Sequence, residues 1–244
     1  MRRVIVVQAR TTSTRLPGKV LMDLAGRPML AQQLLRLKRC RLADEIVVAT
    51  TTNATDDSVV ALARAAGVRW FRGSERDVLE RYVGAVRDAR ADVVVRVTAD
   101  CPLIDSDVSD RVIDALSGGS MPSDYTSNVT PRTYPQGLDT EALFADTLER
   151  VHRMARSESA REHVTTFIYR EHPDLFLVQS VTDQEDNSDL RWTVDEAADL
   201  ELVRRLYDAL GVGERAVGYR ELLAYARAHP ELSALNRTSA ARRT

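Results

Sequence analysis

The 244-residue sequence has little of what marks the specialised classes of protein. It has two cysteines, Cys40 and Cys101, too few for a disulfide framework and without metal-ligand spacing. No apolar run approaches the ~18 residues that a membrane-spanning helix requires. The first residues lack the apolar core and cleavage site of a signal peptide. These absences predict a cytoplasmic protein without a membrane partner.

The sequence also lacks an excess of charge of either sign. Lysine and arginine total 34 and aspartate and glutamate total 36, so the net charge is −2. Proteins that bind nucleic-acid phosphates usually carry a basic excess, so we expect no nucleic-acid partner. The length and the 44% of apolar residues suit one globular domain with a sizeable core. We place this domain at residues 1–236, followed by a flexible basic tail at 237–244.

The first half of the chain alternates between strand-like and helix-like patterns. Short continuous apolar runs are typical of strands that are buried on both faces. We expect strands at residues 4–7, 46–50, 68–71 and 92–98. Helices are expected at residues 28–39, from Asp56 or Asp57 to Gly67, at 77–89 and at 105–116. Such alternation predicts an α/β fold with a doubly wound, mostly parallel sheet.

The second half is less regular. Strand patterns occur at residues 124–129, 176–181 and 190–194, and helix patterns at 147–154, 158–171, 196–210 and 219–228. There is no internal repeat and no low-complexity linker. The simplest organisation is one domain with a small inserted lobe at roughly residues 124–183.

The loop at residues 8–19 directly follows the first expected strand. It carries three cations, Arg10, Arg15 and Lys19, together with four hydroxyl side chains and no carboxylate. Ligands of open α/β sheets bind at the carboxyl ends of the strands. Arginine forks and lysine ammonium groups both suit phosphate oxygens. The loop therefore indicates a phosphate site, or else a solvated basic surface, and it matches neither the P-loop nor Gly-x-Gly-x-x-Gly.

Two aspartates each directly follow a segment that is expected to be a strand. Asp100 lies just past the fourth expected strand, and Asp195 follows the apolar run at residues 190–194. Mg²⁺ is usually held by one or two carboxylates plus substrate phosphates. Asp195 alone would be read as a helix N-cap, and Asp105 is expected to cap the helix that follows it.

Three weaker groups complete the candidates. Residues 72–74 follow the third strand and reach the same sheet edge. Asp139 and Glu141 are two residues apart, and so lie on one face if the chain is extended there. His163 is the histidine best placed for function, although an isolated helical histidine is more often structural.

Taken together, these segments resemble the cytidylyltransferase family that includes the spore-coat polysaccharide biosynthesis protein SpsF, and more distantly the synthetases of CMP-sialic acid and CMP-Kdo. The resemblance covers roughly residues 3–208. One departure is Ala99, where the family usually has glycine. The segments that carry the resemblance are Gln8-Ala9-Arg10-x-x-Ser13-x-Arg15-Leu16-Pro17-Gly18-Lys19, Arg72-Gly73-Ser74, Asp100-Cys101-Pro102-Leu103-Ile104, Tyr134-Pro135-x-Gly137-Leu138-Asp139, Glu162-His163-Val164 and Leu190-Arg191-Trp192-Thr193-Val194-Asp195.

This resemblance implies a Rossmann-like nucleotidyltransferase fold, and a homodimer. It also implies an enzyme that transfers CMP from CTP to an acidic sugar or related anionic small molecule and releases pyrophosphate. Asp100 and Asp195 would bind Mg²⁺, and Arg15, Lys19 and Asp100 would be catalytic. The expected nucleotide contacts are Ala9, Arg10, Ser13, Arg15, Lys19, Arg72 and Ser74, and the expected acceptor contacts are Asp139, Glu141 and His163.

Two other functions are weighed against this one. A nucleotide-sugar-dependent glycosyltransferase would need a metal-binding Asp-x-Asp after the fourth strand, whereas Asp105-Ser106-Asp107 stands where a helix cap is expected. A non-catalytic nucleotide-binding module would require the loss of Asp100, Asp195 or Lys19, and the sequence retains all three.

Overall fold

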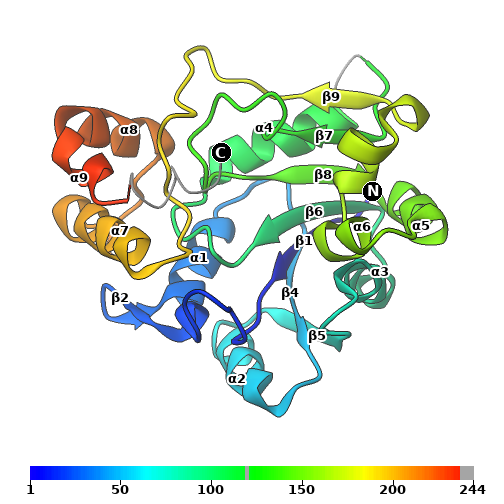
Figure 1. Cartoon of the computed structure of the whole chain (residues 1–244), viewed down its shortest axis with the longest axis horizontal. Helices are drawn as coiled ribbons and strands as arrows, with labels where there is room; N and C mark the ends of the chain where they lie inside the picture. Colours follow the sequence, from blue (N-terminus) through cyan, green and yellow to red (C-terminus); the bar gives the residue numbers. More distant parts are fainter. Residues whose placement is uncertain (119–120, 237–244) are drawn as a thin grey trace.

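The computed structural model describes residues 1–118 and 121–236, so the expected tail at 237–244 lies outside the described residues. Within them the central feature is a seven-stranded sheet in the order β5-β4-β1-β6-β8-β7-β9 (Figure 1). The strands are β1 (Arg3–Gln8), β4 (Glu45–Thr51), β5 (Arg69–Gly73), β6 (Val93–Thr98), β7 (Tyr125–Ser127), β8 (Glu141–Phe144) and β9 (Val178–Ser180), with a separate hairpin of β2 (Asp23–Leu24) and β3 (Arg27–Pro28).

The helices connect these strands and follow the last of them. In the part of the chain that the structure describes, the α-helices are α1 (Met29–Leu37), α2 (Asp57–Ala65), α3 (Val78–Ala89), α4 (Ser106–Ser117), α5 (Ala145–Met154), α6 (Glu158–His163), α7 (Ala197–Leu210), α8 (Tyr219–Ala228) and α9 (Pro230–Ala234). None of them is long and apolar enough to cross a membrane.

The four strands predicted in the first half form the parallel part of the sheet, with β1 between β4 and β6. Ile5 of β1 pairs with Ile46 on one side and Val95 on the other. Val4 and Val6 point into the core beneath α3 and α5, while Ile5 and Val7 point into the core beneath α1, α2 and α4. The prediction of a doubly wound, mostly parallel sheet is therefore confirmed.

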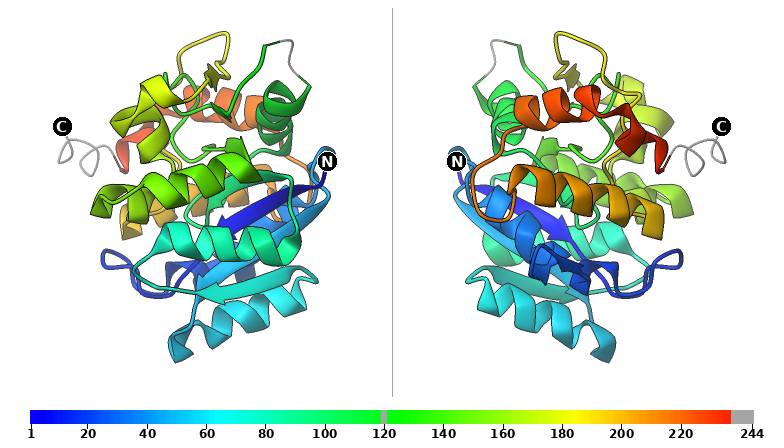
Figure 2. Two further views of the ribbon diagram at one scale, coloured as in Figure 1. Left: turned by 90° about the vertical axis from the view of Figure 1, so that its right-hand side faces the viewer. Right: turned by 90° about the vertical axis from the view of Figure 1, so that its left-hand side faces the viewer.

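A third core lies beside the sheet rather than against its faces. It joins α7 and α8 to Trp192 and Leu138, all of which are buried. Figure 2 shows the two sides, with α3 and α5 in front of the sheet in the left panel and α7 and α8 in front in the right panel. The C-terminal helices α7 and α8 thus pack against the segments that contain Leu138 and Trp192.

Residues 124–183 contribute β7, β8 and β9 to the same sheet. β8 runs antiparallel to both β6 and β7, whereas β7 and β9 are parallel to each other. Because β8 is antiparallel, it begins close to the edge at which the parallel strands end. Glu141, its first residue, pairs with Arg96 of β6.

Two expected elements of the second half were wrong. Residues 190–194 form no strand, and only an isolated bridge joins Arg191 to Gln136. The apolar side chains of that run are buried in the core around Trp192, so burial alone produced the strand-like pattern.

The single helix expected at residues 158–171 is broken at Val164, which has a φ of 61° and a ψ of −63°. The Thr165 N–H donates to the His163 carbonyl over 2.6 Å, which closes a three-residue γ-turn. A π-helix then runs over Phe167–Glu171. Apolar residues continue on both sides of the break, so periodicity does not reveal it.

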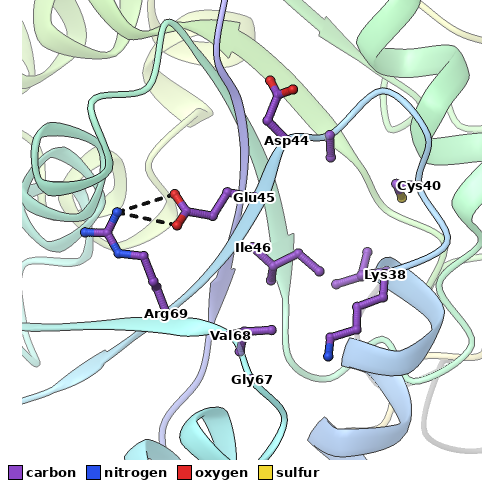
Figure 3. A pocket seen from close by; sticks show the side chains of 10 residues that line it. Lys38, Cys40, Asp44, Glu45, Ile46, Gly67, Val68 and Arg69 are labelled. Atoms are coloured by element: carbon purple, nitrogen blue, oxygen red, sulfur yellow. Dashed lines mark hydrogen bonds and ion pairs between the residues drawn. The ribbon is translucent and has the colours of Figure 1, made fainter.

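A depression of about 300 Å³ lies where β4 and β5 begin, which is the edge of the sheet opposite the one where the parallel strands end (Figure 3). Glu45 on its wall is paired with Arg69. Burial raises the pKa of the nearby Cys40 thiol to about 12. This thiol is therefore protonated at neutral pH and is not a nucleophile.

Candidate functional site

A cavity of about 330 Å³ opens where β1 and β6 end. It gathers residues from the first loop, from the segment after β6, from α6 and from the start of the α7 segment. Seven of the residues predicted from sequence line it: Arg10, Ser13, Arg15, Lys19, Asp100, His163 and Asp195. Ala99, the departure from the family pattern, also lines it.

Gly18 shapes the cationic loop. Its φ of 70° lies in the left-handed region, which favours glycine. In this conformation its N–H donates to the Thr11 carbonyl over 2.9 Å, and a short 3₁₀ turn begins at Lys19. The turn directs Lys19 inward, where the residue is only 9% exposed.

Asp56 anchors the other end of this loop. Its Oδ1 accepts hydrogen bonds from the Thr11 N–H and hydroxyl at 2.8 and 2.7 Å, and its Oδ2 accepts from the Thr51 hydroxyl at 2.5 Å. Asp56 stands at the N-cap position of α2 but makes no side-chain capping bond there. Burial alone would raise the pKa of Asp56, but the hydrogen bonds from Thr51 and Thr11 outweigh it and lower the pKa.

Asp56→Asn should therefore destabilise the protein in a pH-dependent way. A carboxylate with a lowered folded-state pKa contributes stability above its unfolded pKa of ~3.9 and loses it at lower pH. We expect the variant to lose about 1–3 kcal/mol at pH 7, the cost of weakened charge-assisted bonds. The deficit should shrink below about pH 4.

Denaturant unfolding of both proteins between pH 7 and pH 3 measures this difference. Asp57→Asn is the control, because the Asp57 side chain is 67% exposed and pairs only at the surface with Arg72. A deficit that does not change with pH would contradict the role assigned to the Asp56 charge.

Lys19 lines the cavity and contacts both aspartates. Its Nζ donates to the Val194 carbonyl over 2.6 Å and lies 3.2 Å from Asp195 Oδ1 and 3.5 Å from Asp100 Oδ2. Arg15 adds a second cation, with its Nη2 2.7 Å from the same Asp195 oxygen. The Arg15 side chain is 43% exposed, so it reaches this carboxylate from the solvent side.

Backbone contacts bring the two carboxylates together although they are 95 residues apart in the sequence. The Asp100 carbonyl accepts from the Val194 N–H at 2.8 Å and from the Thr193 hydroxyl at 3.3 Å. On another side of the same segment Gly137 comes close to Thr193, because its φ is 113° and a Cβ there would lie 2.6 Å from the Thr193 nitrogen. Asp195 thus follows an irregular segment and not the predicted strand.

The alternative role for Asp195, as the N-cap of the helix that follows it, is also not observed. Glu196 occupies the N-cap of α7 and forms a reciprocal capping box with Asp199. Burial would raise the pKa of Asp195, but Lys19, Arg191 and Arg15 outweigh it and lower the pKa. The Asp195 carboxylate is therefore ionised at neutral pH and faces the cavity.

A second cavity of about 380 Å³ adjoins the first and shares Arg96, Thr98 and His163 with it. Asp139 and Glu141, both predicted from sequence, line it. Asp139 holds a bidentate pair with Arg132 at 2.6 and 2.8 Å.

Glu141 is only 4% exposed and is fully engaged. Its carboxylate pairs with Arg96 and accepts from the hydroxyls of Tyr125 at 2.7 Å and Thr165 at 2.9 Å. Glu141 therefore holds Arg96 in place.

Arg96 lies at the junction of the two cavities and was not among the predicted site residues. Burial alone would lower the pKa of Arg96, but the Glu141 carboxylate outweighs it and raises the pKa. The sequence does contain a signal, because Arg96 is the one charged residue within the apolar strand Val93–Thr98. A cation in such a position needs a buried partner or a ligand.

Three predicted nucleotide contacts do not line either cavity. Arg72 donates to the Thr51 and Asn53 carbonyls at 2.8 and 2.6 Å. The Ser74 hydroxyl accepts from an N–H in the turn before α3, and Ala9 is buried. Their roles remain predictions.

Asp105 serves the helix and not the cavity. Its Oδ1 accepts from two N–H groups in the first turn of α4, both at 3.0 Å, and the residue is 5% exposed. The helix cap predicted there is confirmed, which removes Asp105 from a glycosyltransferase-type metal motif.

The donor set at Asp100 and Asp195 suits a hard cation. In residues 1–118 and 121–236 no cluster of three or more His, Cys, Asp or Glu side chains could hold a metal alone. Two carboxylates beside a cavity that is also lined by Arg10, Arg15 and Lys19 are what Mg²⁺ uses when a nucleotide supplies its remaining oxygens. The residues present therefore fit a Mg²⁺–nucleotide complex.

The comparisons with known proteins agree with this geometry. The chain is 34% identical to the spore coat polysaccharide biosynthesis protein SpsF of Bacillus subtilis over 85% of its length and 87% of that protein. It is 33% identical to a 3-deoxy-manno-octulosonate cytidylyltransferase of Anaeromyxobacter dehalogenans, covering 69% of this chain and 74% of the relative.

A solved cytidylyltransferase structure from Leptospira borgpetersenii superposes with a TM-score of 0.90 at 30% identity, covering 96% of this chain and 97% of the other. The model of the cytidylyltransferase family matches residues 4–224. The chain therefore belongs to the cytidylyltransferase family and is an enzyme of this type.

Proposed function

We propose that the protein transfers CMP from CTP to an acidic sugar or related anionic small molecule and releases pyrophosphate. The observation that carries this proposal is the position of Lys19, which lies between the Asp100 and Asp195 carboxylates beside a second cavity, with Arg15 on the same Asp195 oxygen. Cations and a carboxylate pair at one site suit a triphosphate with its metal, and the adjoining cavity suits an acceptor.

In the proposed reaction an acceptor oxygen forms a bond to the α-phosphorus while the bond to the leaving pyrophosphate oxygen breaks. Such transfers depend on positioning and on charge stabilisation more than on covalent help from the protein. Lys19 and Arg15 offset the negative charge that builds on the pyrophosphate. Asp100 and Asp195 would hold Mg²⁺, which supplies Lewis-acid polarisation of the phosphate oxygens.

The charges around the second cavity support an anionic acceptor. Glu141 is paired with Arg96, and Asp139 is paired with Arg132. His163 and Arg170 also line this cavity, and neither has a carboxylate partner among the described residues. These two side chains are available to an acceptor anion, with Arg96 held at the junction where the two substrates would meet.

The nucleotide is tested by calorimetry with Mg²⁺ and each of CTP, UTP, ATP and GTP. We expect CTP to bind at least about tenfold more tightly, because a wrong base leaves buried polar groups unpaired. Release of pyrophosphate over a panel of acidic sugars and phosphonates then tests the reaction. Tightest binding of a purine nucleotide, or release of a nucleoside diphosphate in place of pyrophosphate, would contradict the proposal.

A further inference from the structure

The Asp195 carboxylate is held on the side facing away from the cavity. Its Oδ1 faces Lys19 and Arg15, while its Oδ2 accepts from Arg191 Nη2 at 2.8 Å. Arg191 is held in turn by Asp199, at 2.9 and 3.2 Å. The two oxygens of Asp195 thus have separate tasks, one toward the cavity and one toward the interior.

Asp199 is the hub of this arrangement and is 0% exposed. Its Oδ2 also accepts the backbone N–H groups of Asp195 and Glu196, both at 2.9 Å. It therefore fixes Asp195 twice, through the backbone and through Arg191. A buried carboxylate is stable in such a position only if its oxygens are satisfied by donors.

A further hydrogen bond to the Asp199 carboxylate comes from the C-terminal end of the described residues. The Asn236 side-chain amide donates to Asp199 Oδ1 at 2.9 Å and to the Arg191 carbonyl at 3.0 Å. Asn236 is 3% exposed and follows α9, far in sequence from the cationic loop. One amide group thus binds both the Asp199 carboxylate and the Arg191 backbone carbonyl. Asp199 and Arg191 are the two residues that hold Asp195.

We propose that Asn236 is a positioning residue for the Asp195 carboxylate, acting through Asp199 and Arg191. This inference rests on the proposed function, in which Asp195 holds Mg²⁺ with CTP. Groups that orient a metal-binding carboxylate typically change metal affinity or activity by 10–100-fold when they are removed. The C-terminal segment is on this view part of the site, although it does not line the cavity.

The test compares Asn236→Ala and Asn236→Asp with a matched control. Asn187 is also buried at 3% exposure and also donates to several partners, but these are Asp183, Tyr219 and the Glu185 carbonyl, outside the site. Asn187→Ala therefore reports the loss of a buried asparagine without effect on Asp195. Calorimetry measures the Mg²⁺ concentration needed for half-maximal CTP binding, the affinity for CMP, and the melting temperature.

We expect the half-maximal Mg²⁺ concentration to rise about tenfold in Asn236→Ala and further in Asn236→Asp, which sets a second carboxylate against Asp199. Asn187→Ala should lower the melting temperature without moving the Mg²⁺ requirement, and CMP affinity should change little in all three variants. If Asn236 only packs, Asn236→Asp keeps the volume and should be milder than Asn236→Ala, which would overturn the inference. Unchanged Mg²⁺ dependence in both Asn236 variants would also overturn it, whereas failure of the wild-type protein to bind CTP would contradict the proposed function itself.

Discussion

Lys19→Ala is expected to lower turnover by about 10²–10³-fold, by analogy with the loss of one oxyanion donor. The Nζ group lies within 3.5 Å of both Asp100 and Asp195, and we assign it to the departing pyrophosphate. CMP lacks that pyrophosphate, so its affinity should change much less than the rate. Arg15→Ala should act in the same direction.

The rate of pyrophosphate release and the dissociation constant of CMP, measured on the same preparation, decide this prediction. The sequence offers a matched control, because Lys38 is its only other lysine and lies on α1's C-terminal end, away from the cavity. Lys38→Ala should leave both quantities unchanged. Equal losses in CMP affinity and in rate for Lys19→Ala would show that Lys19 holds the nucleoside end instead.

Asp100 and Asp195 should behave as a single functional unit. Both contact the same lysine, and the carbonyl of one binds the segment that carries the other. If they share one metal, either alanine substitution removes the same step, with losses of about 10³-fold or more by analogy with other groups that act together. The double variant should then be little worse than the worse single variant.

Asp195→Asn separates this role from a structural one. The substitution preserves shape, and Glu196 rather than Asp195 caps α7, so folding should be retained. We expect a large loss of rate and a higher Mg²⁺ requirement in a protein that still folds, with a lower melting temperature because Lys19, Arg15 and Arg191 lose a charged partner. A folded Asp195→Asn enzyme with a near wild-type rate and Mg²⁺ dependence would reduce Asp195 to a structural residue and leave Asp100 as the only proposed protein ligand.

The parallel part of the fold could be predicted because local pattern and tertiary environment agree there. Three of the four apolar runs, β1, β4 and β6, are largely buried strands, and the fourth, β5, is a partly buried strand at the edge of the sheet. Asp77 and Asp105 cap the helices that follow β5 and β6. The first loop and Asp100 could be placed at one edge because parallel strands end together.

The rest of the site depends on contacts that periodicity does not record. The run at residues 190–194 is strand-like because Leu190, Trp192 and Val194 are buried in the core with α7 and α8, not because the run pairs in the sheet. Arg72, whose nucleotide contact remains a prediction, does not line either cavity and is held beside β4 by three hydrogen bonds. Asn236 contacts Arg191 and Asp199, which are 45 and 37 residues away along the chain, so no local spacing could identify it.

Because β8 runs antiparallel to β6, the two cavities are built from different stretches of the chain. The first draws mainly on residues 8–20 and 96–100, and the second on residues 129–141 and 163–170, with Arg96, Thr98 and His163 in common. On the proposed assignment, evolution can change side chains in the later stretches and so alter the acceptor without disturbing the nucleotide half. Exchange of those stretches between relatives is accordingly a rational route to hybrid enzymes that retain one donor and accept different sugars.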